Sequence, residues 1–153
     1  AKALEKKTLV ILHLATHGLY EEEEFTGTKL PGSLALSDYL LTSNEVIKWN
    51  LKGTEMVILS ACDTGKGQIN ADGLFGLSRA FLIAGASMVI VSLWPVSDNS
   101  TKNLMVKFYD NLIKMAKGGT INVSRAFQEA MIWMKGRREH KSPLEWSPFI
   151  VIG

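Results

Sequence analysis

The stretch EMVILSA at residues 55–61 decides the fold, because it is a short, almost unbroken apolar run rich in strand-forming residues. Two similar runs occur in the chain, TLVILHLAT at residues 8–16 and SMVIVSL at residues 87–93. A strand with one face in water alternates apolar and polar residues, whereas a strand covered on both faces is apolar throughout. The three runs therefore predict buried strands of a mainly parallel sheet.

Helical patterns separate these runs. One helix is expected from about Asp72, with an apolar stripe that Gly85 closes. A second begins at Ser97-Asp98 and stops at Gly118-Gly119, and a third begins near Asn122. Shorter elements are expected as well: a strand over residues 34–36, a helix over residues 42–49 and a final strand over residues 147–152. This alternation predicts a three-layer α/β/α sandwich with a mainly parallel sheet, and its 153 residues suit one domain, residues 1–153.

Composition excludes several classes of protein. Hydrophobic residues make up 46% and charged residues 21%, which excludes a disordered tail. The 17 basic and 15 acidic side chains give a formal charge of only +2, which favours neither a nucleic-acid nor a membrane-surface partner. The longest apolar run, residues 83–94, falls short of the ~20 residues that cross a bilayer. The lone cysteine suits a reducing compartment, so the sequence predicts a cytoplasmic domain.

Two reactive side chains follow the first two predicted strands. His17 ends the first run, and Cys62, the single cysteine, follows the second. If these strands are parallel neighbours, both residues lie at the carboxyl edge of the sheet, where α/β proteins bind ligands. An imidazole there would take the thiol proton and activate the sulfur as a nucleophile. Gly18 lacks a Cβ, so its N–H would be accessible to a developing oxyanion. Taken singly, Cys62 is more simply inert filler and His17 a strand cap.

Other candidate residues support less specific chemistry. Asp98 either caps the helix that follows the third strand, or faces the cleft and recognises a basic substrate side chain. His13, inside the first strand, is expected to be a hydrogen-bonded histidine of the core or of a second layer rather than a ligand, and His140 lies in a basic loop with no partner at the spacing of a site. One cysteine and three scattered histidines predict no metal site and no cofactor.

Three motifs in order carry a family resemblance: ATHG at residues 15–18, LSACDTG at residues 59–65 and SLWPV at residues 92–96. Together they resemble the CHAT peptidase family, a branch of the caspase-like cysteine proteases related to separases and metacaspases. The resemblance implies a caspase-type fold in which His17 is the general base and Cys62 the nucleophile. It also implies that the backbone N–H groups of Gly18 and Cys62 form the oxyanion hole.

The resemblance further implies a regulated cysteine endopeptidase that acts on a specific protein substrate in bacterial signalling or defence. Tetratricopeptide or other sensor domains are often part of such chains, and these residues look like the C-terminal, catalytic half of a larger protein. Metacaspases, which cut after Arg or Lys, carry an acid two residues before the cysteine, where this chain has Ser60. A basic-residue preference therefore rests on Asp98 alone. A catalytically silent scaffold that binds a protein partner, and a hydrolase of small molecules, remain as alternatives.

Overall fold

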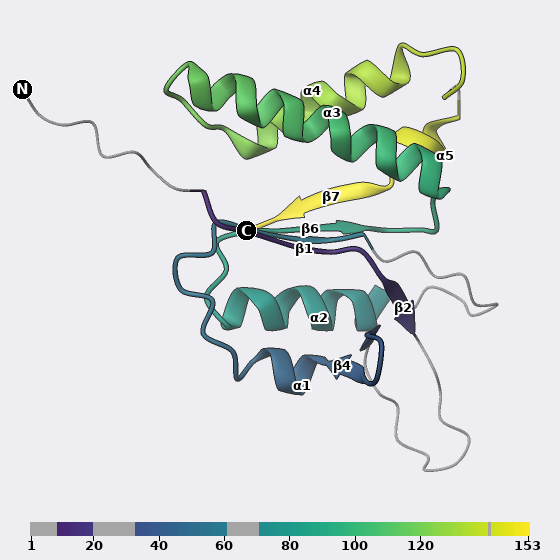
Figure 1. The fold of residues 1–153 in the computed structure, drawn as a ribbon. Helices are drawn as coiled ribbons and strands as arrows, with labels where there is room; N and C mark the ends of the chain where they lie inside the picture. Colours follow the sequence, from purple (N-terminus) through teal and green to yellow (C-terminus); the bar gives the residue numbers. More distant parts are fainter. Residues whose placement is uncertain (1–8, 20–32, 61–70, 141) are drawn as a thin grey trace, which may run out of the picture.

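A computed structural model describes residues 9–19, 33–60, 71–140 and 142–153 (Figure 1). Its central sheet has four strands in the order β1 (Ile11–Leu14), β5 (Met56–Leu59), β6 (Val89–Ser92) and β7 (Phe149–Ile152). β1 runs parallel to β5 and β5 parallel to β6, while β7 is antiparallel to β6. The prediction of an α/β protein with a mainly parallel sheet is confirmed.

Helices lie on both faces of this sheet (Figure 1). α1 (Ser43–Val46) and α2 (Ala71–Ile83) lie on one side, and α3 (Asp98–Lys117), α4 (Val123–Lys135) and α5 (Pro143–Trp146) lie on the other. All four residues of β5 are buried: Met56 and Ile58 pack into the cluster with α3 and α4, whereas Val57 and Leu59 pack into the cluster with α2. Burial on both faces explains why the strand sequence is apolar throughout.

The helices begin at side chains that satisfy their free backbone N–H groups. Ser97 accepts a hydrogen bond from the N–H of Ser100 at the start of α3, and Asn122 accepts one from Arg125 at the start of α4. In α1 the Glu45 carboxylate accepts bonds from the N–H and the hydroxyl of Thr42. The bond from the Thr42 N–H is the main reason that the pKa of Glu45 is lowered. The cap residues expected from the sequence therefore occur at the expected helix starts.

One expected strand is wrong in its extent. Residues 8–16 do not form one strand, because β1 ends at Leu14 and β2 (His17–Leu19) belongs to another sheet. In that sheet β2 pairs antiparallel with β3 (Ser33–Ala35), which pairs with β4 (Leu40–Thr42). The Thr16 hydroxyl donates a hydrogen bond to the carbonyl of Ala35, which fixes the chain where it changes partners. The change falls at Ala15-Thr16, where the apolar run ends, and His17-Gly18 looks in the sequence like the end of a strand and not the start of another.

Gly85 closes α2 as expected, and its substitution gives a test of this packing. Its φ of +112° is unfavourable for other residues, and an added Cβ would lie 3.0 Å from the backbone nitrogen of Lys52. Gly53 has a φ of +90° with open space around it, so Gly53→Ala introduces backbone strain alone. We expect Gly85→Ala to lower the free energy of unfolding by more than about 1 kcal/mol, and by more than Gly53→Ala. If urea unfolding shows that Gly85→Ala and Gly53→Ala lose the same free energy of unfolding, the steric explanation is contradicted.

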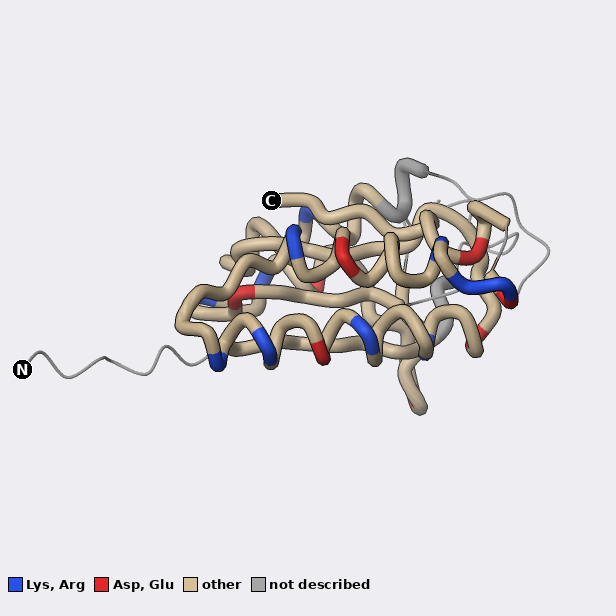
Figure 2. The backbone as a smooth tube through the Cα atoms, turned by 90° about the horizontal axis from the view of Figure 1, so that it is seen from above, with Lys and Arg blue, Asp and Glu red and all other residues tan. Residues whose placement is uncertain are grey.

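Charged residues of both signs are distributed over the described part of the chain. Lys and Arg are interspersed with Asp and Glu along the backbone (Figure 2). No helix in the described part of the chain is long and apolar enough to cross a bilayer.

Candidate active site

The carboxyl ends of β1 and β5 lie side by side in the sheet. Leu14, the last residue of β1, pairs in register with Leu59, the last residue of β5. The pairing extends one residue further, because the Ser60 N–H donates to the carbonyl of Leu14 at 3.1 Å. His17 follows Leu14 by three residues, and Cys62 follows Leu59 by three residues. The two motif residues therefore stand at equal distances along the chain from one pair of neighbouring strand ends.

The predicted dyad falls partly within the described structure. The backbones of His17 and Gly18 open β2, where they pair with Ala35 and Leu34 of β3. His17 therefore does not simply end the first strand, as the sequence suggested, but begins a second one. Cys62 and the side chain of His17 lie outside the described residues. Their roles, and those of the Gly18 and Cys62 N–H groups in an oxyanion hole, stay predictions.

Asp98 occupies the first turn of α3, directly after the cap residue Ser97, and it is exposed. A carboxylate at this position interacts favourably with the positive end of the helix dipole. The helix begins after the carboxyl end of β6, which is the end of the sheet where β2 also lies (Figure 1). The location agrees with the helix-terminus role considered from the sequence. Recognition of a basic substrate side chain by Asp98 stays a prediction.

A side-chain network that the sequence did not reveal lies beside this edge. The Nε2 atom of His13 in β1 lies 2.9 Å from the Oγ of Ser60, and its Nδ1 atom lies 3.0 Å from the hydroxyl of Tyr109 in α3. His13 is hydrogen-bonded, as expected, but its ring is partly exposed and does not belong to the core. Partial burial lowers the pKa of His13, because the charged imidazole loses hydration there.

This lowered pKa predicts a pH-dependent stability. Between the unfolded and folded pKa values of His13, the unfolded chain binds more protons than the folded one, so stability increases with pH there. The contribution is complete above about pH 6.5 and is lost as the pH falls through the lower folded value. NMR titration should give a His13 pKa below 6.5. The difference in unfolding free energy between pH 7 and pH 5 should shrink in His13→Gln, and a His13 pKa at or above the ordinary value would contradict this.

His140, expected in a basic loop, is buried in the structure. It is only 3% exposed, and its Nε2 atom lies 3.3 Å from the side-chain nitrogen of Asn103 in α3. Its Nδ1 atom lies 3.5 Å from the hydroxyl of Ser100 and 3.6 Å from a carboxylate oxygen of Glu145 in α5. Basic neighbours in the sequence concealed this burial. The ring connects α3 to the segment that leads into α5.

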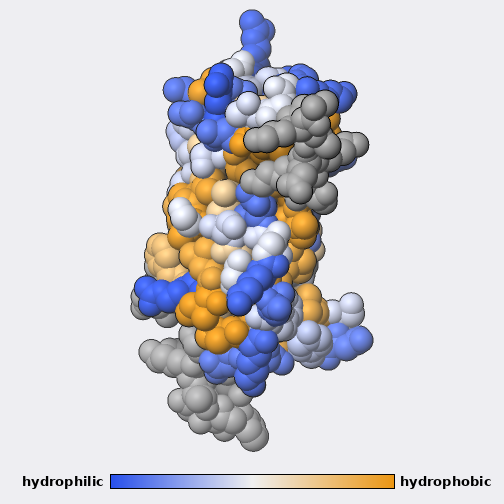
Figure 3. Space-filling model, turned by 90° about the vertical axis from the view of Figure 1, so that its left-hand side faces the viewer, coloured by the Kyte–Doolittle hydropathy of each residue, from blue (hydrophilic) through white to orange (hydrophobic). Residues whose placement is uncertain are grey.

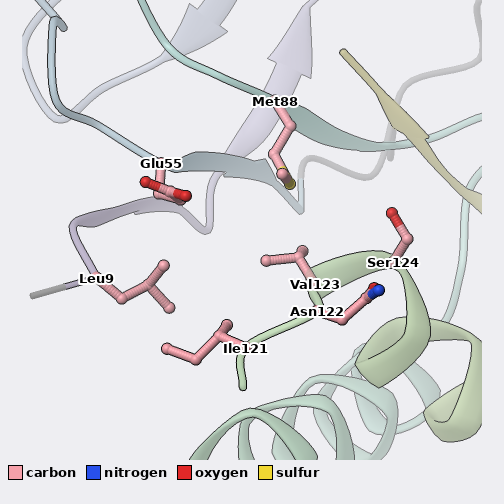
Figure 4. A pocket seen from close by; sticks show the side chains of 7 residues that line it. All are labelled: Leu9, Glu55, Met88, Ile121, Asn122, Val123 and Ser124. Atoms are coloured by element: carbon pink, nitrogen blue, oxygen red, sulfur yellow. The ribbon is translucent and has the colours of Figure 1, made fainter. Parts of the chain in front are cut away.

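A pocket lies at the opposite end of the sheet from the predicted dyad. Its lining comes from the residues before β1, β5 and β6 and from the start of α4 (Figure 4): Leu9, Glu55, Met88, Ile121, Asn122, Val123 and Ser124. Figure 3 views the molecule from this side and shows apolar side chains across its middle. Within the described ranges, His, Asp and Glu form no group of three that would hold a metal ion. The pocket lies before the starts of β1, β5 and β6 and is therefore separate from the carboxyl ends of these strands.

Comparisons with known proteins identify a family for the chain and relatives that match most of it. The family model described as the CHAT domain matches residues 1–153. The human protein named tetratricopeptide repeat protein 28 is 32% identical over 133 residues, which cover 87% of this chain. Its mouse counterpart is 35% identical over 118 residues, or 77% of the chain. The chain spans only 5% of the length of these relatives. Because the family model covers every residue, the chain belongs to the CHAT domain family.

Proposed function

We propose that this chain is the catalytic part, residues 1–153, of a regulated cysteine endopeptidase with a caspase-like three-layer fold. His17 is the general base and Cys62 the nucleophile, and no metal or cofactor takes part. Membership of the CHAT domain family supports this assignment at the level of the family. The full-length protein is the form in which the protein substrate, the residue preference and the activating signal are to be determined.

The observation that carries the proposal is the register between β1 and β5. These strands are parallel neighbours, and Leu14 pairs with Leu59. His17 and Cys62 each follow that pair by three residues. An imidazole and a thiol that follow paired strand ends by equal lengths of chain are expected at one edge, which is the edge where α/β proteins bind substrates. A nucleophile and its base need this proximity.

The proposed reaction proceeds in two steps. The imidazole of His17 takes the proton of Cys62, and the thiolate attacks the carbonyl carbon of the scissile peptide bond. The N–H groups of Gly18 and Cys62 stabilise the oxyanion, and His17 returns the proton to the leaving amine as the C–N bond breaks. His17 then takes a proton from a water molecule, which attacks the thioester and releases the acid and the free thiol.

Regulation is proposed to come from the rest of the full-length protein. The two relatives carry tetratricopeptide repeats in their names, and this chain corresponds to a small part of each. Stacked helical repeats present extended concave surfaces that bind other proteins. A repeat region in the same polypeptide would therefore act as the sensor for the proposed protease. Asp98, exposed at the start of α3, is the proposed contact for a basic substrate side chain.

A second candidate function is a catalytically silent scaffold. The relatives are named for tetratricopeptide repeats, and stacked helical repeats bind other proteins, which favours a binding role. Labelling with a peptide that carries a thiol-directed electrophile separates the two functions. Trypsin cuts after Lys52 and Lys66, so a label on Cys62 appears in the peptide of residues 53–66. The protease predicts labelling that decreases in His17→Ala. No labelling of Cys62 with the sensor engaged would favour the scaffold.

A further inference from the structure

Three elements that are distant in the sequence meet at the ring of His13. Ser60, the residue after β5, is bound to its Nε2 atom at 2.9 Å, and Tyr109, in the middle of α3, is bound to its Nδ1 atom at 3.0 Å. The rings of His13 and Tyr109 are 6.0 Å apart between centroids and tilted by 36°, so the bond to the hydroxyl is made without stacking. The imidazole thus connects α3 to the end of β5.

Ser60 is held at two points. Its N–H donates to the carbonyl of Leu14, which continues the sheet ladder beyond β5, and its hydroxyl bonds to His13. His13 itself pairs with Ile58 in the ladder, so the bond to Ser60 reaches diagonally from one strand to the end of the next. The backbone contact and the side-chain contact together fix the position of Ser60 relative to β1. Ser60 stands two residues before Cys62.

The chemistry of the three groups suits a fixed bridge. A neutral imidazole has one donor nitrogen and one acceptor nitrogen, and each hydroxyl is able to act in either role. Partial burial favours the uncharged form of both rings: it lowers the pKa of His13 and raises the pKa of Tyr109. The bridge therefore satisfies both ring nitrogens without placing a charge between the sheet and α3.

We infer that His13 is a positioning residue for the nucleophile, which holds the chain before Cys62 in place by bridging Ser60 to Tyr109. This inference rests on the proposed function, because it assigns His13 an effect on Cys62. The alternative is that the three side chains contribute only to folding. In that case their removal would lower stability without changing the reactivity of a thiol in folded protein.

The test uses the rate at which iodoacetamide alkylates Cys62 in the full-length protein, followed in the tryptic peptide of residues 53–66 at neutral pH. We expect Ser60→Ala and Tyr109→Phe each to lower this rate by about fivefold, the effect of one lost hydrogen bond. The double variant should lose no more than the stronger single variant, because both hydroxyls act through His13. His13→Gln, which keeps a donor and an acceptor, should retain more of the rate than His13→Leu.

Controls separate positioning from folding and from the dyad itself. Tyr39→Phe removes a hydroxyl from a tyrosine that is 52% exposed, and it should leave the rate unchanged. Thermal unfolding shows which variants are folded at the assay temperature. If His17→Ala slows alkylation but Tyr109→Phe does not, the inference about His13 is overturned while the dyad stands. If the rate losses of Ser60→Ala and Tyr109→Phe multiply in the double variant, the two hydroxyls act independently, and the proposed bridge through His13 is also contradicted. If His17→Ala has no effect, the proposed dyad itself fails.

Discussion

Replacing Cys62 with alanine should reduce peptide-bond cleavage by at least about 1,000-fold, because the proposed reaction has no other nucleophile. His17→Ala should cause nearly the same loss, and the double variant should be no worse than the stronger single one, since the members of a catalytic pair act as a unit. The measurement is cleavage-site profiling against a peptide library, with the full-length protein and its proposed sensor.

The matched control for this loss is Ser124→Ala, an exposed position at the start of α4 near the far pocket. It should leave the cleavage rate unchanged. The unfolding midpoints of Cys62→Ala and His17→Ala should stay close to that of the parent chain. Full cleavage by Cys62→Ala would remove the proposed mechanism, whatever the fold of the domain.

The largest expected effect on stability is at Phe81 in α2. Its side chain is fully buried against β5 and β6, and its ring meets Trp49 edge-on with centroids 6.1 Å apart. Phe81→Ala should lower the free energy of unfolding by about 3–5 kcal/mol, because the cavity cannot fully collapse. The loss should appear as a lower urea midpoint.

Phe75 provides the matched control, because it is the same residue type in the same helix and is 47% exposed. Phe75→Ala should lower the free energy of unfolding much less than Phe81→Ala does, since it removes little buried contact. Equal losses at Phe75 and Phe81 would contradict the described packing of α2 on the sheet.

Much of the sheet was predictable, because hydropathy reports burial directly. The runs that contain β5 and β6 are almost entirely apolar, and both strands are buried on both faces. Ser97 and Asn122 marked helix starts because side-chain capping is a local interaction. The second sheet was missed because its strand β2 is only three residues long, and His-Gly after an apolar run looks like the end of a strand.

The roles of His17 and Cys62 were predicted from the motifs ATHG and LSACDTG and stay predictions. The sequence left open whether the strands before them are neighbours, and the structure pairs β1 with β5. The bond between His13 and Tyr109 joins residues 96 apart in the sequence, and no local pattern marks it. The burial of His140 was hidden for a similar reason, because its polar partners belong to α3 and α5.

The central claim is that His17 makes the thiol of Cys62 a nucleophile, and the pH dependence of alkylation tests it most directly. An ordinary thiol has a pKa of about 8.5, and a neighbouring imidazolium lowers it. In the full-length protein with its sensor engaged, the alkylation rate of Cys62 should reach half its maximum well below that pH, and His17→Ala should return the midpoint close to the ordinary value. An ordinary midpoint that is the same with and without His17 would contradict the account.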